Sequence, residues 1–491
     1  MTKGARRSTI IISLIIVLAA VLRFYGLARE SLWLDEALSL KVAEQGPLFI
    51  LIQIAFDNHP PLYLLILHFW IKIFGPGVYA LRALSAIFGT AAVYLIYRLS
   101  RAIFKEKTAI LSSALFALSI FQVFYSQEAR MYILLALLTL ASVYSFIKLL
   151  DGPPGRRQML FYIISSMLLL YTHYSAITII LVQNIYFLIR YMEDREHPLL
   201  KIKDWLLSQA AILLLYMPLI LAGLSRSIIV KTKTTIFPKS YPLIESLIGI
   251  SGSALLAAIF FGAILYYLLR TFKARRETNS PKDRSFFVLL WLVIPVALTY
   301  IFYKFVRWPF DAKYFMVSAP ALFILAAYSV NLIKKRFIRN SVIIAAIILS
   351  LAQLAFYYND FNRMRWDAAA LYIEKTAMPG DLVLFNDKAG SRSVFDYYFK
   401  RKDVTEALIS PKCLKLPFVG IDRETVEDLK TQAAGRGRVW VVLSNAPDID
   451  RLIEKTMGAD YTIAEHKIFG SVYYVNRKIK NIIEIFLLVK K

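Results

Sequence analysis

The chain has 491 residues, 58% of them hydrophobic and 19% charged, which is too apolar a composition for one or two water-soluble domains. Its formal net charge of +25 would suggest nucleic acid as the partner of a soluble protein, but a membrane accounts for it better, and we expect no nucleic-acid partner. The single cysteine, Cys413, excludes an internal disulfide and a cysteine-rich zinc site.

Apolar segments of membrane-spanning length recur from residue 8 to residue 358, separated by short polar stretches. Because each span needs roughly 20 apolar residues, we predict an α-helical polytopic membrane protein with about 11 transmembrane helices. The predicted spans are 8–28, 79–98, 108–125, 131–149, 159–171, 175–191, 207–224, 245–269, 286–303, 314–333 and 341–358. The first follows Lys3, Arg6 and Arg7 as a signal peptide would, but it lacks a small-residue cleavage site and is predicted to remain as a helix.

The loops between these spans alternate between the two membrane faces, and one set is rich in Lys and Arg. This basic set comprises residues 2–7, 98–107, 148–157, 190–203, 270–284 and 334–339. Since cytoplasmic loops carry an excess of positive charge, we predict an integral protein of the plasma membrane with a cytoplasmic N-terminus and an extracytoplasmic C-terminal region.

Two of the predicted outer loops are long, at residues 28–78 and 225–244. In the first, Leu32–Glu44 and Leu62–Phe74 are apolar on one side and carry aromatic residues. Such segments are typical of short helices that lie in the membrane interface, and we predict that they lie flat and do not span.

The composition changes after Tyr358, where charged residues return at ordinary density. Strand-like runs at 381–385, 438–443 and 461–474 alternate with helical patterns at 367–375, 391–400, 425–434 and 448–457. We therefore predict a small α/β domain outside the membrane, with domain limits of 1–358 and 359–491. Neither a Walker loop nor a dinucleotide fingerprint is present, which disfavours nucleotide-driven chemistry.

Four short motifs with ionisable residues fall on the predicted outer face, at residues 34–36, 59–63, 126–132 and 172–174. Burying charge at a membrane is costly unless the group is partnered or functional, so these motifs are candidates for the site. Asp35 and Glu36 point in two directions on a helix, so one could act as a base while the other orients a sugar hydroxyl, a main-chain group or a cation. The alternative is that Asp35 only caps its helix.

The other three motifs supply the candidate substrate-binding residues, which are His59, Glu128, Arg130, Tyr132, His173 and Tyr174. Two prolines hold His59 rigidly near a helix start, although they could serve only to begin that helix. Arg130 suits a lipid phosphate because a guanidinium makes bidentate hydrogen bonds, whereas an ion pair with Glu128 is the alternative. His173 and Tyr174 could equally be interfacial anchors.

Basic residues on the predicted outer face run against the cytoplasmic charge bias. The candidates for binding a donor phosphate are Arg130, Lys231, Lys233, Arg307 and Lys313, and Lys239 and Lys304 lie in the same two loops. Cations there would stabilise negative charge on a departing phosphate. The alternative is a solvated surface facing anionic lipids.

The segments LWLDEALSL, HPPLYLLILHFW, LRALSAIFGTAAVYLIYRL and SQEARMY, in this order and spacing, resemble a family of membrane glycosyltransferases. This is the glycosyltransferase family 39-like group with the GT-C fold, related to protein O-mannosyltransferases and the lipid A aminoarabinose transferase. The resemblance is strong over residues 20–135 and looser through Trp366. It implies an inverting enzyme that moves a sugar, mannose or a related one, from a polyprenyl-phosphate donor to a hydroxyl of a protein, lipid or glycan.

The resemblance also implies roles for individual residues. Asp35 matches the acid that acts as or beside the general base, and Glu36 is its neighbour. His59 stands where relatives have Lys or His before two prolines, Arg130 matches an arginine that follows a glutamate, and Lys313 resembles a basic residue that contacts phosphate, where many relatives have Arg. No cofactor is required on this basis, a divalent cation is possible, and its ligands are unknown.

Three other functions compete with this interpretation. A transporter or flippase of lipid-linked sugars should carry charges deep within its spans and show related halves, whereas here the charges collect at one face and no repeated half is evident. An oligosaccharyltransferase or ligase would move a longer glycan from a pyrophosphate carrier. A structural membrane protein would leave the four motifs on one face as a coincidence.

Overall fold

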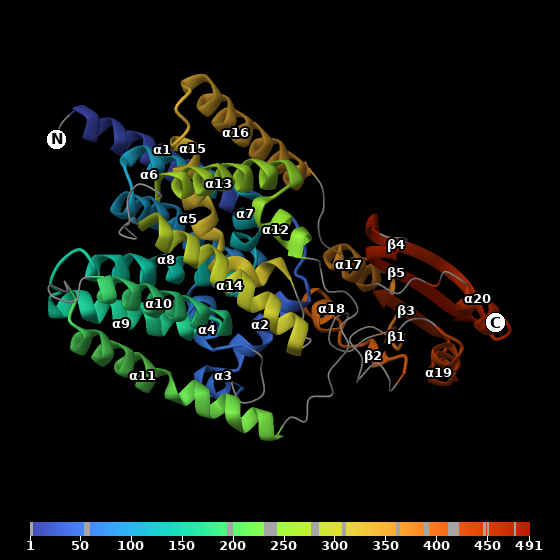
Figure 1. Cartoon of the computed structure of the whole chain (residues 1–491). Coiled ribbons are helices and arrows are strands. Elements are labelled where there is room, and N and C mark those ends of the chain that lie inside the picture. Colours follow the sequence, from blue (N-terminus) through green and yellow to red (C-terminus); the bar gives the residue numbers. More distant parts are fainter. Residues whose placement is uncertain are drawn as a thin grey trace. The chain divides into compact units, whose positions relative to one another are not determined.

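The structure is a computed structural model, and its helices and strands are labelled in Figure 1. It describes residues 3–53, 59–193, 200–229, 243–275, 284–306, 311–359, 364–386, 392–410, 422–444, 448, 451–475 and 478–491. Contacts divide the chain into two compact units, one comprising Met1–Tyr25 with Val42–Phe356 and the other comprising Gly26–Lys41 with Tyr357–Lys491. The two units are described separately.

The first unit is helical (Figure 1). Its α-helices are α1 (Lys3–Phe24), α3 (Pro47–Gln53), α4 (Leu62–Phe74), α5 (Val78–Ile103), α6 (Glu106–Leu118), α7 (Ile120–Ser126), α8 (Tyr132–Leu149), α9 (Arg156–Leu170), α10 (Ile177–Glu193), α11 (Ile202–Ile229), α12 (Leu243–Ser251), α13 (Ala254–Arg275), α14 (Arg284–Val306), α15 (Ala319–Asn331) and α16 (Arg336–Asn359). Two short 3₁₀-helices, η1 (Tyr174–Ala176) and η2 (Ala312–Val317), precede α10 and α15. The predicted helix at Leu62–Phe74 is confirmed to the residue.

The predicted count of eleven spans is not confirmed. Among the described residues, eight helices are long and apolar enough to cross a membrane, and there are nine if α6 and α7 form one bent span. The difference lies in α9 and α15, which have 15 and 13 residues. At 1.5 Å per residue, these helices are about 20–22 Å long, shorter than the hydrocarbon core of a bilayer.

Two of the predicted spans are interrupted. The axis bends by 59° between α6 and α7, where Ser119 caps α7 by accepting a hydrogen bond from the Gln122 N–H. Gly252 separates α12 from α13 with a φ of +102°, a conformation that glycine adopts readily. Both interruptions are short and lie inside longer apolar segments, which is why hydropathy alone predicted uninterrupted helices.

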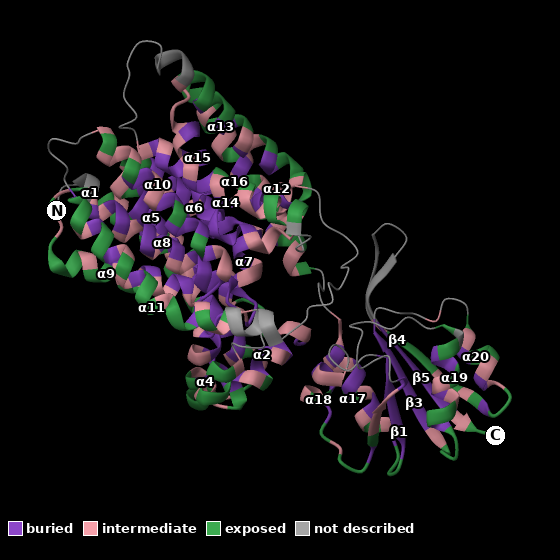
Figure 2. Cartoon of the chain, turned by 60° about the horizontal axis from the view of Figure 1, so that its bottom comes forward, coloured by how far each residue is buried: buried purple, intermediate pink, exposed green. Residues whose placement is uncertain are grey.

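Buried residues concentrate around α5, α6, α8 and α15 (Figure 2). These helices pack on one another, and α15 is buried along nearly all of its length. By contrast, α11, α13 and α16 expose large apolar side chains such as Leu214, Leu255 and Phe356. Apolar exposed surfaces on long helices are the expected contact with lipid.

The second unit contains a mixed sheet of five strands in the order β2-β1-β3-β5-β4. The strands are β1 (Leu382–Phe385), β2 (Thr405–Leu408), β3 (Arg438–Ser444), β4 (Tyr461–Val475) and β5 (Lys478–Lys490). β1 runs parallel to β2 and β3, whereas β5 runs antiparallel to both β3 and β4. The helices are α17 (Trp366–Thr376), α18 (Ser393–Tyr398), α19 (Arg423–Ala433) and α20 (Leu452–Met457), together with the start of α2 (Leu34–Glu44).

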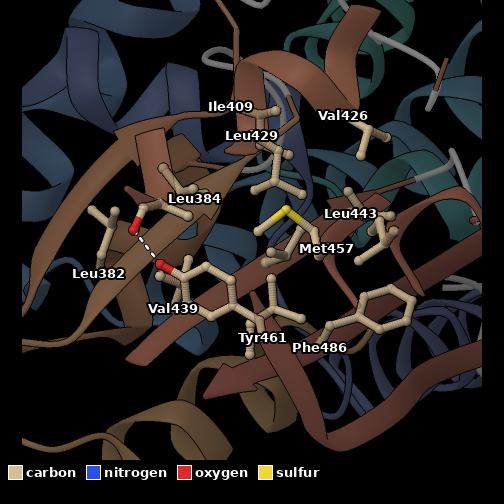
Figure 3. Close-up of a cluster of buried hydrophobic side chains, with 14 residues drawn as sticks. Leu382, Leu384, Ile409, Val426, Leu429, Val439, Leu443, Met457, Tyr461 and Phe486 are labelled. Atoms are coloured by element: carbon tan, nitrogen blue, oxygen red, sulfur yellow. Dashed lines mark hydrogen bonds between the residues drawn. The ribbon is translucent and has the colours of Figure 1, made fainter. Parts of the chain in front are cut away.

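The predicted α/β character of this region is therefore confirmed. The strands β1, β3 and β4 and all four predicted helices are present, while β2 and β5 were not predicted. One face of the sheet packs on α19 and α20 through the hydrophobic cluster shown in Figure 3. Tyr461 contributes its ring to this cluster and donates its hydroxyl hydrogen to the Ala433 carbonyl.

Gly26–Lys41 belongs with the C-terminal residues although it follows the first helix in sequence. Arg29 donates to the Tyr358 and Asn359 carbonyls, and the Leu32 N–H donates to the Tyr398 hydroxyl at 2.7 Å. The start of the first long loop is thus a part of the second unit, which neither hydropathy nor the composition change predicted.

Candidate active site

Four basic side chains gather at one end of the helical unit, and we call them the basic cluster: His59, Arg130, His173 and Lys313. The Arg130 guanidinium lies 3.4 Å from Nε2 of His59, and the rings of His59 and His173 are 6.3 Å apart. These residues come from the segment before α4, the turn between α7 and α8, the end of α9 and η2. Segments more than 250 residues apart in sequence thus contribute to one cluster.

The position of His59 follows from how α4 begins. Pro61 caps α4, and the next N–H, that of Leu62, donates to the Tyr171 carbonyl at the end of α9 at 3.1 Å. Tyr63 is buried, and its hydroxyl lies 2.9 Å from Oγ of Ser85 on α5. These contacts hold the start of α4 against both α9 and α5, and His59 is held with it.

The turn that carries Arg130 is fastened to the end of α1. The side-chain amide of Gln127 donates to the carbonyl oxygens of Leu22, Arg23 and Tyr25, at 3.2, 3.1 and 2.7 Å. Carbonyl oxygens at the end of a helix are available to side-chain donors, so these contacts tie the turn to the end of α1. The Arg130 N–H closes the turn on the Glu128 carbonyl at 2.8 Å.

His173 is held in one tautomer by its local backbone. Its Nδ1 accepts a hydrogen bond from the Ser175 N–H at 3.1 Å, so the neutral ring carries its proton on Nε2. Burial, together with the nearby His59, Arg130 and Lys313, lowers the pKa of His173 to about 3. At neutral pH, His173 is therefore an uncharged hydrogen-bond donor.

Lys313 joins the cluster from η2. Asp311 caps this 3₁₀-helix by accepting from the Lys313 N–H at 3.1 Å, and its other carboxylate oxygen lies 3.8 Å from the lysine Nζ. The ammonium is 5.8 Å from the centre of the Tyr132 ring and 5.9 Å from that of Tyr314. Asp311 was not predicted, although an aspartate directly before the first residue of a helix is a recognisable cap.

Aromatic rings complete the surroundings of His173. Tyr132 lies 6.2 Å from the His173 ring and Tyr314 lies 6.0 Å from it. Of the predicted substrate-binding residues, Glu128 is buried beside Arg130 in sequence, and Tyr174 begins η1 half-buried. The structure therefore brings His59, Arg130, Tyr132, His173 and Lys313 together.

Three predicted phosphate ligands, Lys231, Lys233 and Arg307, lie outside the described residues. Lys239 lies outside them as well. Lys304 is described, and its ammonium stacks over the Tyr300 ring on α14, with 5.7 Å between the ammonium and the ring centre.

The two predicted catalytic acids, Asp35 and Glu36, lie in the second unit. Glu36 is fully buried and accepts a hydrogen bond from the Trp33 N–H at 3.4 Å, so it reaches back to cap α2. The capping role that the sequence offered to Asp35 thus falls to its neighbour. Asp35 is half-buried, and its carbonyl accepts from the Ser39 hydroxyl.

No group of three or more His, Cys, Asp or Glu side chains that could hold a metal ion occurs among the described residues. The chemistry that the basic cluster offers is that of anion binding. A guanidinium, an ammonium and a neutral imidazole N–H are donors suited to the oxygens of a phosphate diester.

Comparisons with known proteins agree with this architecture. ArnT from Cupriavidus metallidurans, in a structure with undecaprenyl phosphate, matches with a TM-score of 0.58 and 12% identity, over 97% of each chain. The oligosaccharyltransferase AglB from Archaeoglobus fulgidus, in complex with an inhibitory peptide and a dolichol-phosphate, matches with a TM-score of 0.56 and 12% identity, over 90% of this chain and 70% of that one. The chain has the GT-C fold. A comparison with curated proteins by sequence found no significant match.

The family resemblance expected of this GT-C chain is confirmed. Residues 58–221 match the model of the family described as dolichyl-phosphate-mannose-protein mannosyltransferase. That segment contains His59, Arg130, Tyr132 and His173 but neither Asp35 nor Lys313. The family match therefore covers most of the basic cluster. The likeness to ArnT covers 97% of the chain and concerns its fold.

Proposed function

We propose that the chain transfers a single sugar from a polyprenyl-phosphate donor to a hydroxyl acceptor at the extracytoplasmic membrane face. The observation that carries this proposal is the basic cluster, in which donors from four separate segments converge at one end of a membrane helical unit. Converging guanidinium, ammonium and imidazole donors suit the oxygens of an anion, and a lipid phosphate is an anion that is present at a membrane surface.

The donor phosphate is bound in this proposal by Arg130, His173 and Lys313. Arg130 provides a planar fork for two phosphate oxygens, and Lys313 provides a point charge. His173 contributes its Nε2–H without a second full charge, because burial lowers its pKa to about 3. His59 lies between Arg130 and His173 and orients the guanidinium.

The transfer step is a displacement at the anomeric carbon. The acceptor oxygen forms a bond to that carbon while the bond to the phosphate oxygen breaks, and the configuration inverts. Polyprenyl phosphate departs with the bonding electrons, which the cations of the basic cluster stabilise. The acceptor proton passes to the Asp35 carboxylate, which acts as general base.

Glu36 has a positioning role in this proposal. Its carboxylate caps α2 at the residue before Leu34, so it fixes the first turn of the helix that carries Asp35. Loss of Glu36 should therefore reduce turnover through misplacement of Asp35 and not through loss of a proton acceptor.

The proposal is tested by replacing Asp35 with Asn in protein purified into lipid nanodiscs. We expect transfer of radiolabelled sugar from its polyprenyl phosphate to fall by about 10²–10⁴-fold, the usual contribution of a general base. Glu44→Gln is the matched control because Glu44 is an exposed acid at the other end of α2. Turnover by Asp35→Asn equal to that of the control would remove Asp35 from the mechanism.

The same preparation separates the competing functions. A single-sugar transferase uses a monophosphate donor, whereas an oligosaccharyltransferase or ligase would use a pyrophosphate-linked glycan. A flippase would move labelled donor between leaflets without forming product. Movement of the donor with no product at any acceptor would contradict the enzymatic proposal.

A further inference from the structure

A second basic site lies at the other end of the helical unit. It is a cavity of about 460 Å³ formed by α1, α5 and α8. Its lining residues are Thr9, Ile12, Tyr94, Tyr97, Arg98, Arg101, Ala102, Tyr144 and Lys148. Helix α8 begins with Tyr132 beside the basic cluster and carries Lys148 in its last turn. At 1.5 Å per residue the two places are about 24 Å apart, so the cavity is not part of the proposed active site.

Arg98 is held in the cavity by two tyrosines. Its two terminal nitrogens donate to the hydroxyl oxygens of Tyr94 and Tyr144, at 2.8 and 3.1 Å. Each ring centre is also 5.7 Å from the guanidinium carbon. A hydroxyl that accepts from arginine keeps its own hydrogen for donation, so the two tyrosines and Arg98 can together donate to one anion.

The cavity keeps excess positive charge after its ion pairs are counted. Arg101 pairs with Glu106 at 2.9 Å, and Lys148 pairs with Asp151 at 2.7 Å. Asp151 is shared with Arg284. Among the described residues, these ion pairs set Arg101, Lys148 and Arg284 against two carboxylates, whereas Arg98 is held by tyrosine hydroxyls, so positive charge exceeds negative charge around this site.

The surroundings of the cavity favour a lipid over a soluble anion. From Thr9, the exposed face of α1 continues through Leu14 and Val17, whose side chains are 64% and 60% exposed. On α5, Tyr94 lines the cavity and is 43% exposed. Acyl chains can lie on this apolar surface while a headgroup occupies the polar cavity, the arrangement found where basic pockets between membrane helices bind anionic lipids.

We propose that this cavity binds the phosphate headgroup of an anionic phospholipid in the leaflet opposite the active site. Arg98 supplies a preoriented fork for two phosphate oxygens, and Lys148 supplies a second charge. The loops around the cavity belong to the basic set that predicts the cytoplasmic face, where anionic lipids are abundant. The bound lipid bridges α1, α5 and α8, so it should stabilise the helical unit.

The test measures lipid retention by native mass spectrometry of the purified full chain. Wild-type protein should retain phosphatidylglycerol in preference to phosphatidylcholine. Arg98→Gln should weaken phosphatidylglycerol binding roughly fivefold, the effect of one basic residue on an anionic lipid. Arg157→Gln is the matched control, because Arg157 is exposed in the same basic set and contacts a ring, that of Phe161, without lining the cavity.

A second variant keeps the test valid if Arg98→Gln fails to fold. Thr9→Trp fills the cavity from the exposed side of α1 and leaves every charge in place, and it should lower phosphatidylglycerol retention as well. Equal retention of the two lipids by wild type, or equal losses in Arg98→Gln and Arg157→Gln, would overturn the proposal. Displacement of the lipid by inorganic phosphate at equal concentration would assign the cavity to a soluble anion instead.

Discussion

Gly89 on α5 is the position where a single methyl group should do most damage to the helical unit. A Cβ atom at this position would lie 2.1 Å from Oγ and 2.9 Å from Cβ of Ser126 on α7, and 2.9 Å from Nε of Arg23 on α1. Rotation of Ser126 can move its hydroxyl but cannot move its Cβ. Gly89→Ala therefore forces α5 and α7 apart.

The size of this effect follows from two opposing contributions. Alanine in place of glycine within a helix stabilises by about 0.5–1 kcal/mol, whereas overpacking in a closely packed core costs typically about 1–3 kcal/mol. Oγ of Ser126 also donates to the Gln122 carbonyl at 2.6 Å, which opposes its displacement. We expect a net loss of about 1–2 kcal/mol in Gly89→Ala. Turnover should fall too, because Ser126 directly precedes the turn that carries Arg130.

Thermal unfolding in detergent measures this prediction. Gly262→Ala is the matched control, since Gly262 lies inside α13 and its Cβ would meet nothing within 4 Å. The decisive comparison is the double variant Gly89→Ala/Ser126→Gly, which removes both clashing atoms of Ser126 and should recover stability beyond the sum of the two single changes. Additive losses, or Gly89→Ala as stable as Gly262→Ala, would refute the steric argument.

Two further predictions concern one residue in each unit. Arg130→Gln should raise the donor KM about tenfold, because hydrogen bonds to charged groups contribute roughly 1.5–3 kcal/mol; steady-state kinetics with an unchanged donor KM would exclude a phosphate contact. Burial, followed by the hydrogen bond with Asp396, raises the pKa of Glu406 from 4.5 to about 7. The folded chain then keeps this proton to higher pH than the unfolded chain, so stability is lost as pH rises from about 4.5 to 7, and Glu406→Gln should flatten that fall in thermal unfolding.

The sequence predicted those features that depend on residues close to one another in the chain. Hydropathy located the long apolar helices, and the motif with two prolines located α4 to the residue. Alternation and composition predicted β1, β3 and β4. β5 escaped prediction because residues 485–489 form a continuous apolar run without alternation, as expected of a strand with buried residues on both faces.

Contacts between distant segments could not be predicted in the same way. In the sequence Gln127 is one polar residue in a turn, yet its amide donates to the carbonyl oxygens of Leu22 and Arg23 in α1 and of Tyr25 just after it. For Glu36 the sequence left open a sugar hydroxyl, a main-chain group or a cation as its partner, and in the structure its carboxylate accepts from the nearby Trp33 N–H at the start of α2. Asp311 was not predicted because the short 3₁₀-helix that it caps leaves no periodic pattern in the sequence.

By itself the sequence determined that this chain is a helical membrane protein with an α/β region at its C-terminal end, because apolar run length and side-chain period are properties of neighbouring residues. The GT-C type was implied by the resemblance of four segments to a known family. Tertiary structure alone decided which polar residues meet. The basic cluster, the neutral state of His173 and the cavity around Arg98 all depend on how helices far apart in sequence pack. Burial sets the protonation state of a side chain, and the distance between segments sets which side chains can contact each other.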